Sequence, residues 1–118
     1  MLDPTVAKRI ERIKETCRLN GIPFQVTSTY RSSAKQAELY RAWLARGKTG
    51  LPAAPPGRST HEYGLAFDAS FPASKRALVV EIARWFGMVW FGPADPVHFD
   101  VYGPQRWSEI LREKAQPG

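Results

Sequence analysis

The sequence predicts a single α+β domain in which helices pack on one face of a small, mostly antiparallel sheet. A length of 118 residues gives room for one hydrophobic core, so we expect one domain over residues 1–118. The hydrophobic share of 43% and the charged share of 24% are typical of globular proteins. Helical and strand-like segments alternate in the order α, β, α, β, α, β, β, α, and the strands show polar faces. One face of the sheet is therefore expected to be partly open.

The first helix is predicted over residues 3–20. Asp3 suits the N-cap, Pro4 the first helical position and Gly21 the position after the last turn. Apolar residues recur at helical steps and predict the buried face, which is made of Val6, Ile10, Ile13 and Cys17. Residues 22–31 then alternate, which predicts a strand. Its apolar side holds Phe24, Val26, Ser28 and Tyr30, and its polar side holds Gln25, Thr27, Thr29 and Arg31.

A second helix and a long loop follow this strand. Ser33 and Gln36 have capping-box spacing and predict where the helix starts. Its residues at helical steps are Ala37, Tyr40 and Leu44. Residues 48–60 form a loop with three prolines, longer than most connections in a compact domain, and loops of this length are often functional.

The second half of the chain holds three strand-like segments and two helices. Residues 64–71 alternate, with Leu65, Phe67, Ala69 and Phe71 on one side and Ala66, Asp68 and Ser70 on the other. A helix is predicted over residues 74–86, with Leu78, Ile82 and Trp85 or Phe86 on its buried side. Short strands are predicted over residues 88–91 and 97–102, and the second one separates Val97, Phe99 and Val101 from His98, Asp100 and Tyr102. Pro104 opens the last helix, whose inward residues are Trp107, Ile110 and Leu111.

Composition excludes several classes of protein. No run approaches the roughly 20 apolar residues that a membrane span needs, and the N-terminal residues are too charged for a signal peptide. Cys17 is the only cysteine, so no internal disulfide and no four-cysteine zinc site can form. The net charge of +6 favours a polyanionic partner. We expect no nucleic-acid partner, because the cations are dispersed and no nucleic-acid motif is present. No long apolar seam suggests an obligate dimer, so we expect a monomer.

Polar residues from three strands are expected to meet on the open face of the sheet. Alternation places Arg31, Asp68 and His98 on non-core faces. In an unbroken strand, His61 would lie roughly 23 Å from Asp68, so a reversal near Gly64 is needed to bring the two together. Two imidazoles and one carboxylate, with a fourth position open for water, form a known catalytic zinc set. Alternatively, each histidine has a structural role and Arg31 pairs with a nearby acid.

A second carboxylate is expected beside this group. Asp95 precedes His98 by three residues, and Pro96 favours a turn that brings their Cα atoms within about 7 Å. A zinc hydrolase needs a carboxylate beside the metal to take a proton from water and pass it to the leaving amine. Asp95 is the candidate for that role.

These residues carry a family resemblance. The segments STHEYGLAFD (59–68), STYRS (28–32) and DPVHFD (95–100) are similar, in this order, to the motifs of the LAS-type zinc peptidases of peptidase family M15. The resemblance implies the hedgehog/D-Ala-D-Ala-peptidase fold, with a zinc cleft on the open face. Thr29 stands where the family commonly has glycine, and Asp100 where it often has glutamate. The second departure affects the support of His98.

Residue roles follow from this resemblance. It implies that one zinc ion is bound by His61, Asp68 and His98. It further implies that Asp95 is the general base and acid, that Arg31 binds substrate and stabilises the oxyanion, and that Ser59 hydrogen-bonds the substrate. The implied substrate is the stem peptide of peptidoglycan.

The resemblance leaves three functions open. Asp95 favours an L-alanyl-D-glutamate endopeptidase of the phage endolysin type. The alternatives are a D-alanyl-D-alanine carboxypeptidase or dipeptidase, and a non-catalytic zinc-binding recognition module. Without a signal peptide, we expect a protein that is made in the cytoplasm and reaches the cell wall as phage lysis enzymes do, or an excised domain of a longer protein.

Overall fold

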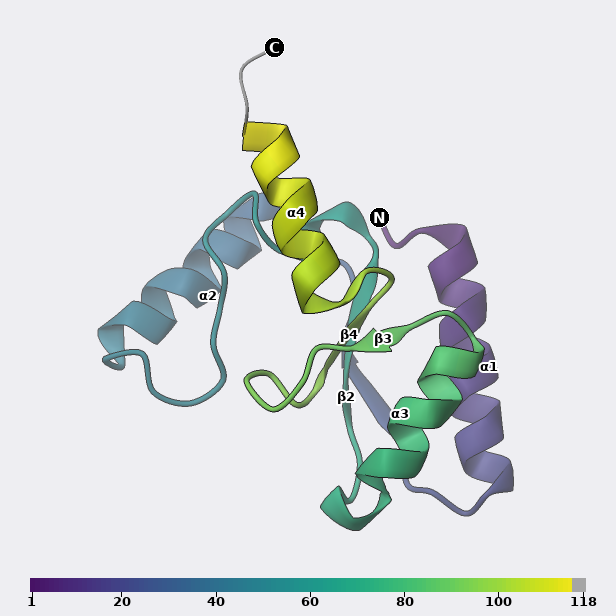
Figure 1. Ribbon diagram of the computed structural model, residues 1–118. Coiled ribbons are helices and arrows are strands. Elements are labelled where there is room, and N and C mark those ends of the chain that lie inside the picture. Colours follow the sequence, from purple (N-terminus) through teal and green to yellow (C-terminus); the bar gives the residue numbers. More distant parts are fainter. Residues whose placement is uncertain (116–118) are drawn as a thin grey trace.

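The computed structural model describes residues 1–115 and has the predicted order of elements (Figure 1). The elements are α1 (Pro4–Leu19), β1 (Gln25–Ser28), α2 (Ser33–Ala45), the short 3₁₀ helix η1 (Thr60–Tyr63), β2 (Ala66–Ser70), a second 3₁₀ turn η2 (Ala73–Lys75), α3 (Arg76–Trp85), β3 (Val89–Trp90), β4 (His98–Asp100) and α4 (Gly103–Ala115). None of the described helices is long and apolar enough to span a membrane.

The four strands form one sheet in the order β1-β2-β4-β3, and every neighbouring pair is antiparallel. The predicted α+β class is therefore confirmed. β2 is a central strand, and the register places Asp68 opposite Ser28 of β1 and His98 of β4. A register shift between Val26 and Ser28 interrupts the β1–β2 pairing just beside Asp68. The sheet thus brings the predicted polar residues of β2 and β4 side by side.

The hydrophobic core lies between the sheet and the pair α1 and α3, which lie together on one side of the sheet in Figure 1. The first helix behaves as its sequence predicts, because the Asp3 carboxylate caps it by accepting from the Thr5 and Val6 N–H groups. Its predicted buried face is confirmed at Val6, Ile10, Ile13 and Cys17. From the sheet, Phe67 and Phe99 enter the core with their rings stacked 5.0 Å apart.

The second helix differs from its prediction. Ser32 caps α2, and Gln36, which is 1% exposed, donates to the Ala54 carbonyl instead of completing a capping box. Gln36 is the only buried residue of α2, and Leu44 is 40% exposed. The reason is that α2 packs beside a cleft and not onto the core. Two further residues expected on buried faces are also exposed, Tyr30 by 45% and Trp85 by 63%, whereas Phe86 packs against the core.

The chain reverses at Gly64, where the backbone has φ +71° and lies against the N-terminal segment. The Asp3 N–H donates to the Gly64 carbonyl at 2.9 Å. A Cβ atom at position 64 would overlap the Met1 carbonyl oxygen and come 2.9 Å from the Asp3 nitrogen. Only glycine therefore suits both the conformation and the space at this position.

We expect Gly64→Ala to lower the free energy of unfolding by more than Gly21→Ala does. The left-handed conformation costs a side chain about 1–2 kcal/mol at either position. Gly21 has a similar φ of +67° but nothing within 4 Å of a Cβ atom, so it isolates the conformational cost. Urea denaturation of the two variants measures the difference. Equal losses would show that the N-terminal segment moves aside freely.

Candidate metal centre and cleft

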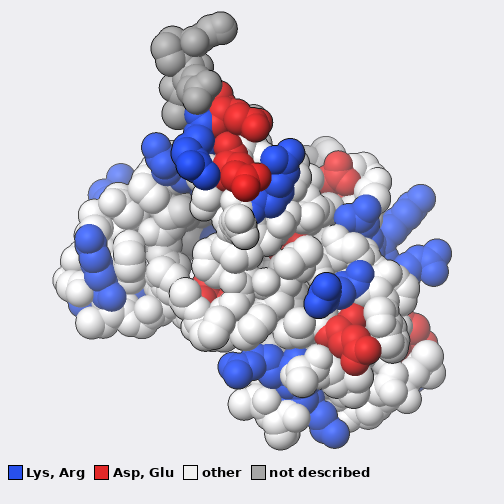
Figure 2. Space-filling model, in the orientation of Figure 1, with Lys and Arg blue, Asp and Glu red and all other residues white. Residues whose placement is uncertain are grey.

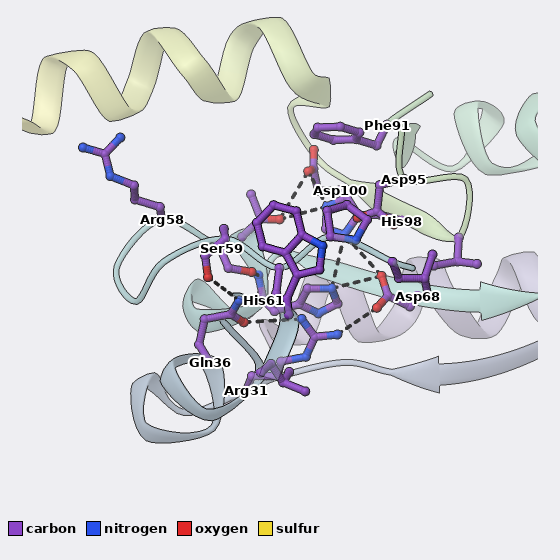
Figure 3. A pocket seen from close by; sticks show the side chains of 18 of the residues that line it. Arg31, Gln36, Arg58, Ser59, His61, Asp68, Phe91, Asp95, His98 and Asp100 are labelled. Carbon is purple, nitrogen blue, oxygen red and sulfur yellow. Dashed lines mark hydrogen bonds and ion pairs between the residues drawn. The ribbon is translucent and has the colours of Figure 1, made fainter. Parts of the chain in front are cut away.

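The structure brings His61, Asp68 and His98 together from three elements, η1, β2 and β4 (Figure 3). The Asp68 Oδ1 atom lies 3.1 Å from His61 Nε2 and 3.2 Å from His98 Nδ1, and the two nitrogens are 3.2 Å apart. Ligands of one zinc ion are spaced about 3–3.5 Å apart, since each lies about 2.0–2.2 Å from the metal. The three donor atoms therefore fit a single small cation.

The reversal at Gly64 positions His61, as the sequence predicts. Ser59 caps η1 by accepting from the His61 N–H, and Glu62 completes the capping box. The Nδ1–H group of His61 donates to the Thr29 carbonyl at 2.6 Å. This bond leaves Nε2 without a hydrogen and free to act as a ligand, which is the usual support of a metal-binding histidine.

His98 is supported from its far side by a buried carboxylate. Its Nε2–H group donates to Asp100 Oδ2 at 2.8 Å, and the Thr60 hydroxyl donates to the same oxygen at 3.2 Å. Asp100 is 1% exposed, and its other oxygen accepts from the Tyr102 and Gly103 N–H groups. Both histidines thus present one nitrogen to the metal position and donate from the other.

The electrostatics of this group follow from burial and close charges. Burial disfavours the charged form of His98, but the Asp100 and Asp68 carboxylates outweigh it and raise the pKa of His98 to about 9. Burial also disfavours the Asp68 carboxylate, yet its close contacts with the imidazoles of His61 and His98 hold the pKa of Asp68 far below its usual range. Asp100 likewise has a lowered pKa, because His98 and two backbone N–H groups outweigh its burial. A cation is therefore strongly favoured at this position.

We expect Asp100→Asn to weaken metal binding by about 10–100-fold, the usual cost of losing a partner of a metal-binding histidine. The amide cannot accept as strongly from His98 Nε2, so the ring is held less firmly and is a poorer ligand. Competition with a chromophoric chelator measures the dissociation constant. Asp95→Asn is the matched control, because the Asp95 carboxylate forms no hydrogen bond with either histidine, and the substitution keeps the backbone carbonyl that accepts from the His98 N–H. Unchanged affinity in Asp100→Asn would contradict the supporting role.

Arg31 lies close to the same group, although not on a strand as expected. β1 ends at Ser28, and the Arg31 backbone N–H donates to the His61 carbonyl at 3.1 Å. Its guanidinium donates to Asp68 Oδ2 at 2.8 Å, and also to the Ser28 hydroxyl and the Gln36 side chain. The alternative that Arg31 pairs with a nearby acid is thus correct, and the acid belongs to the candidate site.

Asp95 occupies the predicted turn. The His98 N–H donates to the Asp95 carbonyl at 3.1 Å, which closes the turn around Pro96. The half-buried Asp95 side chain lines the cleft, and within residues 1–115 its carboxylate forms no hydrogen bond or ion pair. Burial, together with the Asp68 carboxylate, raises its pKa against the opposing effect of nearby cations. A carboxylate with these properties can exchange protons with a molecule in the cleft.

The cleft has a volume of about 520 Å³ and extends well beyond the metal group. Ser59, 7% exposed, lines it next to His61. Sequence reasoning missed several of its lining residues, which are Gln36, Trp43, Arg58, Phe91 and Trp107. A buried glutamine on an otherwise exposed helix would have been a signal for Gln36, but burial is not visible in the sequence. The two tryptophans come from α2 and α4.

The cations of the visible face are spread among acidic residues and do not form one patch (Figure 2). This distribution agrees with the dispersed charge of the sequence. We therefore expect charged groups of a ligand to be recognised in the cleft and not on this face. Arg31 and three aspartates, Asp68, Asp95 and Asp100, line that cleft.

A small antiparallel sheet carries two histidines and an aspartate at an open cleft. This fold and cleft define the class of the protein, a metallopeptidase. Within that class, residues 1–90 match the family model VanY, D-alanyl-D-alanine carboxypeptidase, and the chain belongs to this family. The resemblance to family M15 peptidases that the sequence shows is thereby confirmed.

Individual relatives differ in the bond they act on. The peptidoglycan L-alanyl-D-glutamate endopeptidase CwlK of Bacillus subtilis (strain 168) is 28% identical over 109 residues, covering 77% of this chain and 65% of CwlK. The chain thus spans slightly less than two thirds of that relative.

Solved structures agree on the fold. The LdcB LD-carboxypeptidase superposes with a TM-score of 0.73 at 22% identity, covering 98% of this chain and 72% of LdcB. A variant of the D,D-pentapeptidase VanY from a VanB-type resistance cassette, in complex with Zn(II), superposes with a TM-score of 0.70 at 22% identity. The match covers 94% of this chain and 78% of that VanY chain. The Serratia marcescens L-Ala D-Glu endopeptidase ChiX superposes with a TM-score of 0.59 at 22% identity, covering 84% of this chain and 79% of ChiX.

Proposed function

We propose that this chain is a zinc-dependent peptidoglycan peptidase that cuts the L-alanyl-D-glutamate bond of the stem peptide. The observation that carries the proposal is the His61, Asp68 and His98 group, which lies in an open cleft with the unpaired carboxylate of Asp95. The bond is inferred from the endopeptidase CwlK, which is 28% identical to this chain. The partner is the peptidoglycan stem peptide at the cell wall, and the acting form is a monomer.

One zinc ion is the cofactor that best suits these ligands. His61, Asp68 and His98 would hold it, since two imidazoles and a carboxylate with an open fourth position are a known catalytic zinc set. A bound zinc ion supplies a Lewis acid that polarises the scissile carbonyl and lowers the pKa of a coordinated water. The complex of a VanY relative with Zn(II) supports this choice of metal.

Asp95 is the general base and acid of the proposed reaction. Its carboxylate takes a proton from the attacking water and delivers it to the leaving amine when the peptide bond breaks. Two properties suit it to this task, its raised pKa and its lack of a competing partner among the described residues. A carboxylate engaged in an ion pair, such as that of Asp68, would hold the proton too weakly.

Arg31 and Ser59 are the proposed substrate-binding residues. Arg31 uses three of its N–H groups for Ser28, Gln36 and Asp68, which leaves two of the five donors of a guanidinium for the substrate. A fixed cation at this position offsets the negative charge that develops on the carbonyl oxygen. The Ser59 hydroxyl accepts from His61 N–H and retains its own hydrogen for donation to the peptide.

A second candidate is a carboxypeptidase that releases terminal D-alanine. It is favoured by the description of the matching family, D-alanyl-D-alanine carboxypeptidase, and by the free donors of Arg31, which could bind a terminal carboxylate. The two functions differ in the position of the cut along the stem peptide.

Digestion of purified peptidoglycan distinguishes these candidates. The protein is incubated with the polymer before and after chelation and with zinc restored, and the released ends are identified by mass spectrometry. New N-terminal D-glutamate that depends on zinc is the expected result. Released D-alanine would establish the carboxypeptidase instead, and intact polymer with one tightly bound zinc ion would favour a recognition module.

A further inference from the structure

The position of the Asp95 carboxylate is set by the backbone of its loop. No side chain of the described residues holds this carboxylate by a hydrogen bond or an ion pair. Asp95 lies between β3 and β4, in a loop over residues 91–97 that contains Gly92 at φ +115°. A catalytic group on such a loop is placed correctly only if the loop itself is held, since misplacement by about 1 Å can cost about 100-fold in rate.

Most hydrogen bonds of this loop only close the loop on itself or continue the sheet. The Asp95 N–H donates to the Gly92 carbonyl at 3.1 Å, and the Phe91 N–H donates to the His98 carbonyl at 2.9 Å. At the far end, the Ala69 N–H donates to the Val97 carbonyl at 3.0 Å. The His98 N–H also donates to the Asp95 carbonyl at 3.1 Å and so holds the peptide that directly follows Asp95, but none of these bonds holds the carbonyl of Pro96.

Trp90 supplies the contact that holds the Pro96 carbonyl. Its indole Nε1–H donates to the carbonyl of Pro96 at 2.9 Å, across the base of the loop. Pro96 is the neighbour of Asp95, and proline has no N–H of its own with which to anchor the turn. The bond therefore holds the Pro96–Val97 peptide unit, which lies between the proposed general base and the metal-binding His98.

The indole is itself held rigidly. Trp90 pairs with Phe99 in the sheet and packs against the hydrophobic core. The guanidinium of Arg76 lies 5.2 Å from the centre of its ring, a cation–π contact. Trp90 does not line the cleft, so a change at this position removes no side chain from its lining.

We propose that Trp90 is a positioning residue for the reaction, which holds the Pro96 carbonyl and through it places the Asp95 carboxylate beside the metal group. This inference rests on the proposed function, since it assumes that Asp95 moves the proton. Trp90 acts on the rate of the chemical step and not on the binding of metal or substrate.

The test is Trp90→Phe, which removes the N–H donor but keeps an aromatic ring for the core and for Arg76. We expect kcat to fall about 10–100-fold, with KM and the zinc dissociation constant unchanged. Trp85→Phe is the matched control and should match the wild type, because Trp85 is 63% exposed and donates no hydrogen bond to any residue that the structure describes. An unchanged kcat in Trp90→Phe, or a matching loss of zinc affinity, would overturn the inference.

A double-mutant cycle separates positioning from general destabilisation. In an Asp95→Asn background, Trp90→Phe should cost nothing further in kcat, because the group that it places is already absent. Full additivity of the two losses would contradict the inference.

A measurement without metal or substrate checks the contact itself. The indole N–H signal of Trp90, assigned by its loss in Trp90→Phe, should exchange with solvent more slowly than that of Trp85. Equally fast exchange would overturn the inference even if the enzyme is active. A wild-type protein that hydrolyses no peptidoglycan would instead overturn the proposed function, and this inference with it.

Discussion

Asp95→Asn is expected to lower kcat by about 100–10,000-fold, the usual contribution of a general acid–base residue. The amide keeps the size of the side chain but can neither accept nor deliver the proton. Metal binding should be unchanged, because His61, Asp68 and His98 are untouched. Hydrolysis of peptidoglycan and zinc titration of the same preparation measure the two properties. Glu38→Gln, on the exposed side of α2, is the control for the loss of a carboxylate.

The same variant should alter pH dependence and stability in defined directions. Burial raises the pKa of Asp95, so wild-type activity should fall as the pH drops through a value above 3.8. The raised pKa also means that the ionised carboxylate costs folding energy at neutral pH. Asp95→Asn should therefore be at least as stable as the wild type at pH 7. A marked loss of stability, with activity lost in proportion, would argue that Asp95 is a structural residue.

Asp68→Ala is expected to abolish both metal binding and hydrolysis. Asp68 is the only candidate ligand that also pairs with Arg31, and both side chains are largely buried, with exposures of 14% and 19%. Removing one partner of a buried ion pair costs about 3–5 kcal/mol, and the partial exposure places this pair near the lower limit. Metal-free Asp68→Ala should thus be less stable than the metal-free wild type by about 3 kcal/mol.

Chelation provides the reference for this variant. Treating the wild type with a chelator should remove its activity but leave the ion pair between Arg31 and Asp68 intact. Adding zinc should restore the activity of the wild type but not that of Asp68→Ala. Urea denaturation in the presence of the chelator measures the difference in stability. A variant that still binds one zinc ion with wild-type affinity would exclude Asp68 from the ligands.

Local patterns predicted the parts of the fold that depend on neighbours along the chain. The caps and the buried face of α1 follow from residues three and four apart, and the alternation of β2 correctly separates Phe67 from Asp68. For α2, the spacing of apolar residues correctly predicted a helix. It did not predict which side is buried, because Gln36 is buried and Leu44 is 40% exposed. Periodicity shows that a helix has one apolar side, but not what that side meets.

The candidate site divides in the same way. The chemical types and spacing of His61, Asp68 and His98 are visible in the sequence, as is the turn that carries Asp95. The partners that support these residues are not. Thr60 and Asp100 meet only because β4 and η1 lie together, and Trp90 reaches Pro96 because β3 pairs with β4 and the loop between them folds back.

The groups of the candidate site are all visible in the sequence: two imidazoles, a carboxylate for the metal position, a proline turn with a second carboxylate, and an arginine. Their placement and their supports depend on the tertiary fold. The physical reason is that alternation assigns each residue to a face, whereas hydrogen bonds between residues about 40 positions apart depend on strand order and register. Bonds of this kind join Thr60 to Asp100, which supports His98, and His61 to the Thr29 carbonyl.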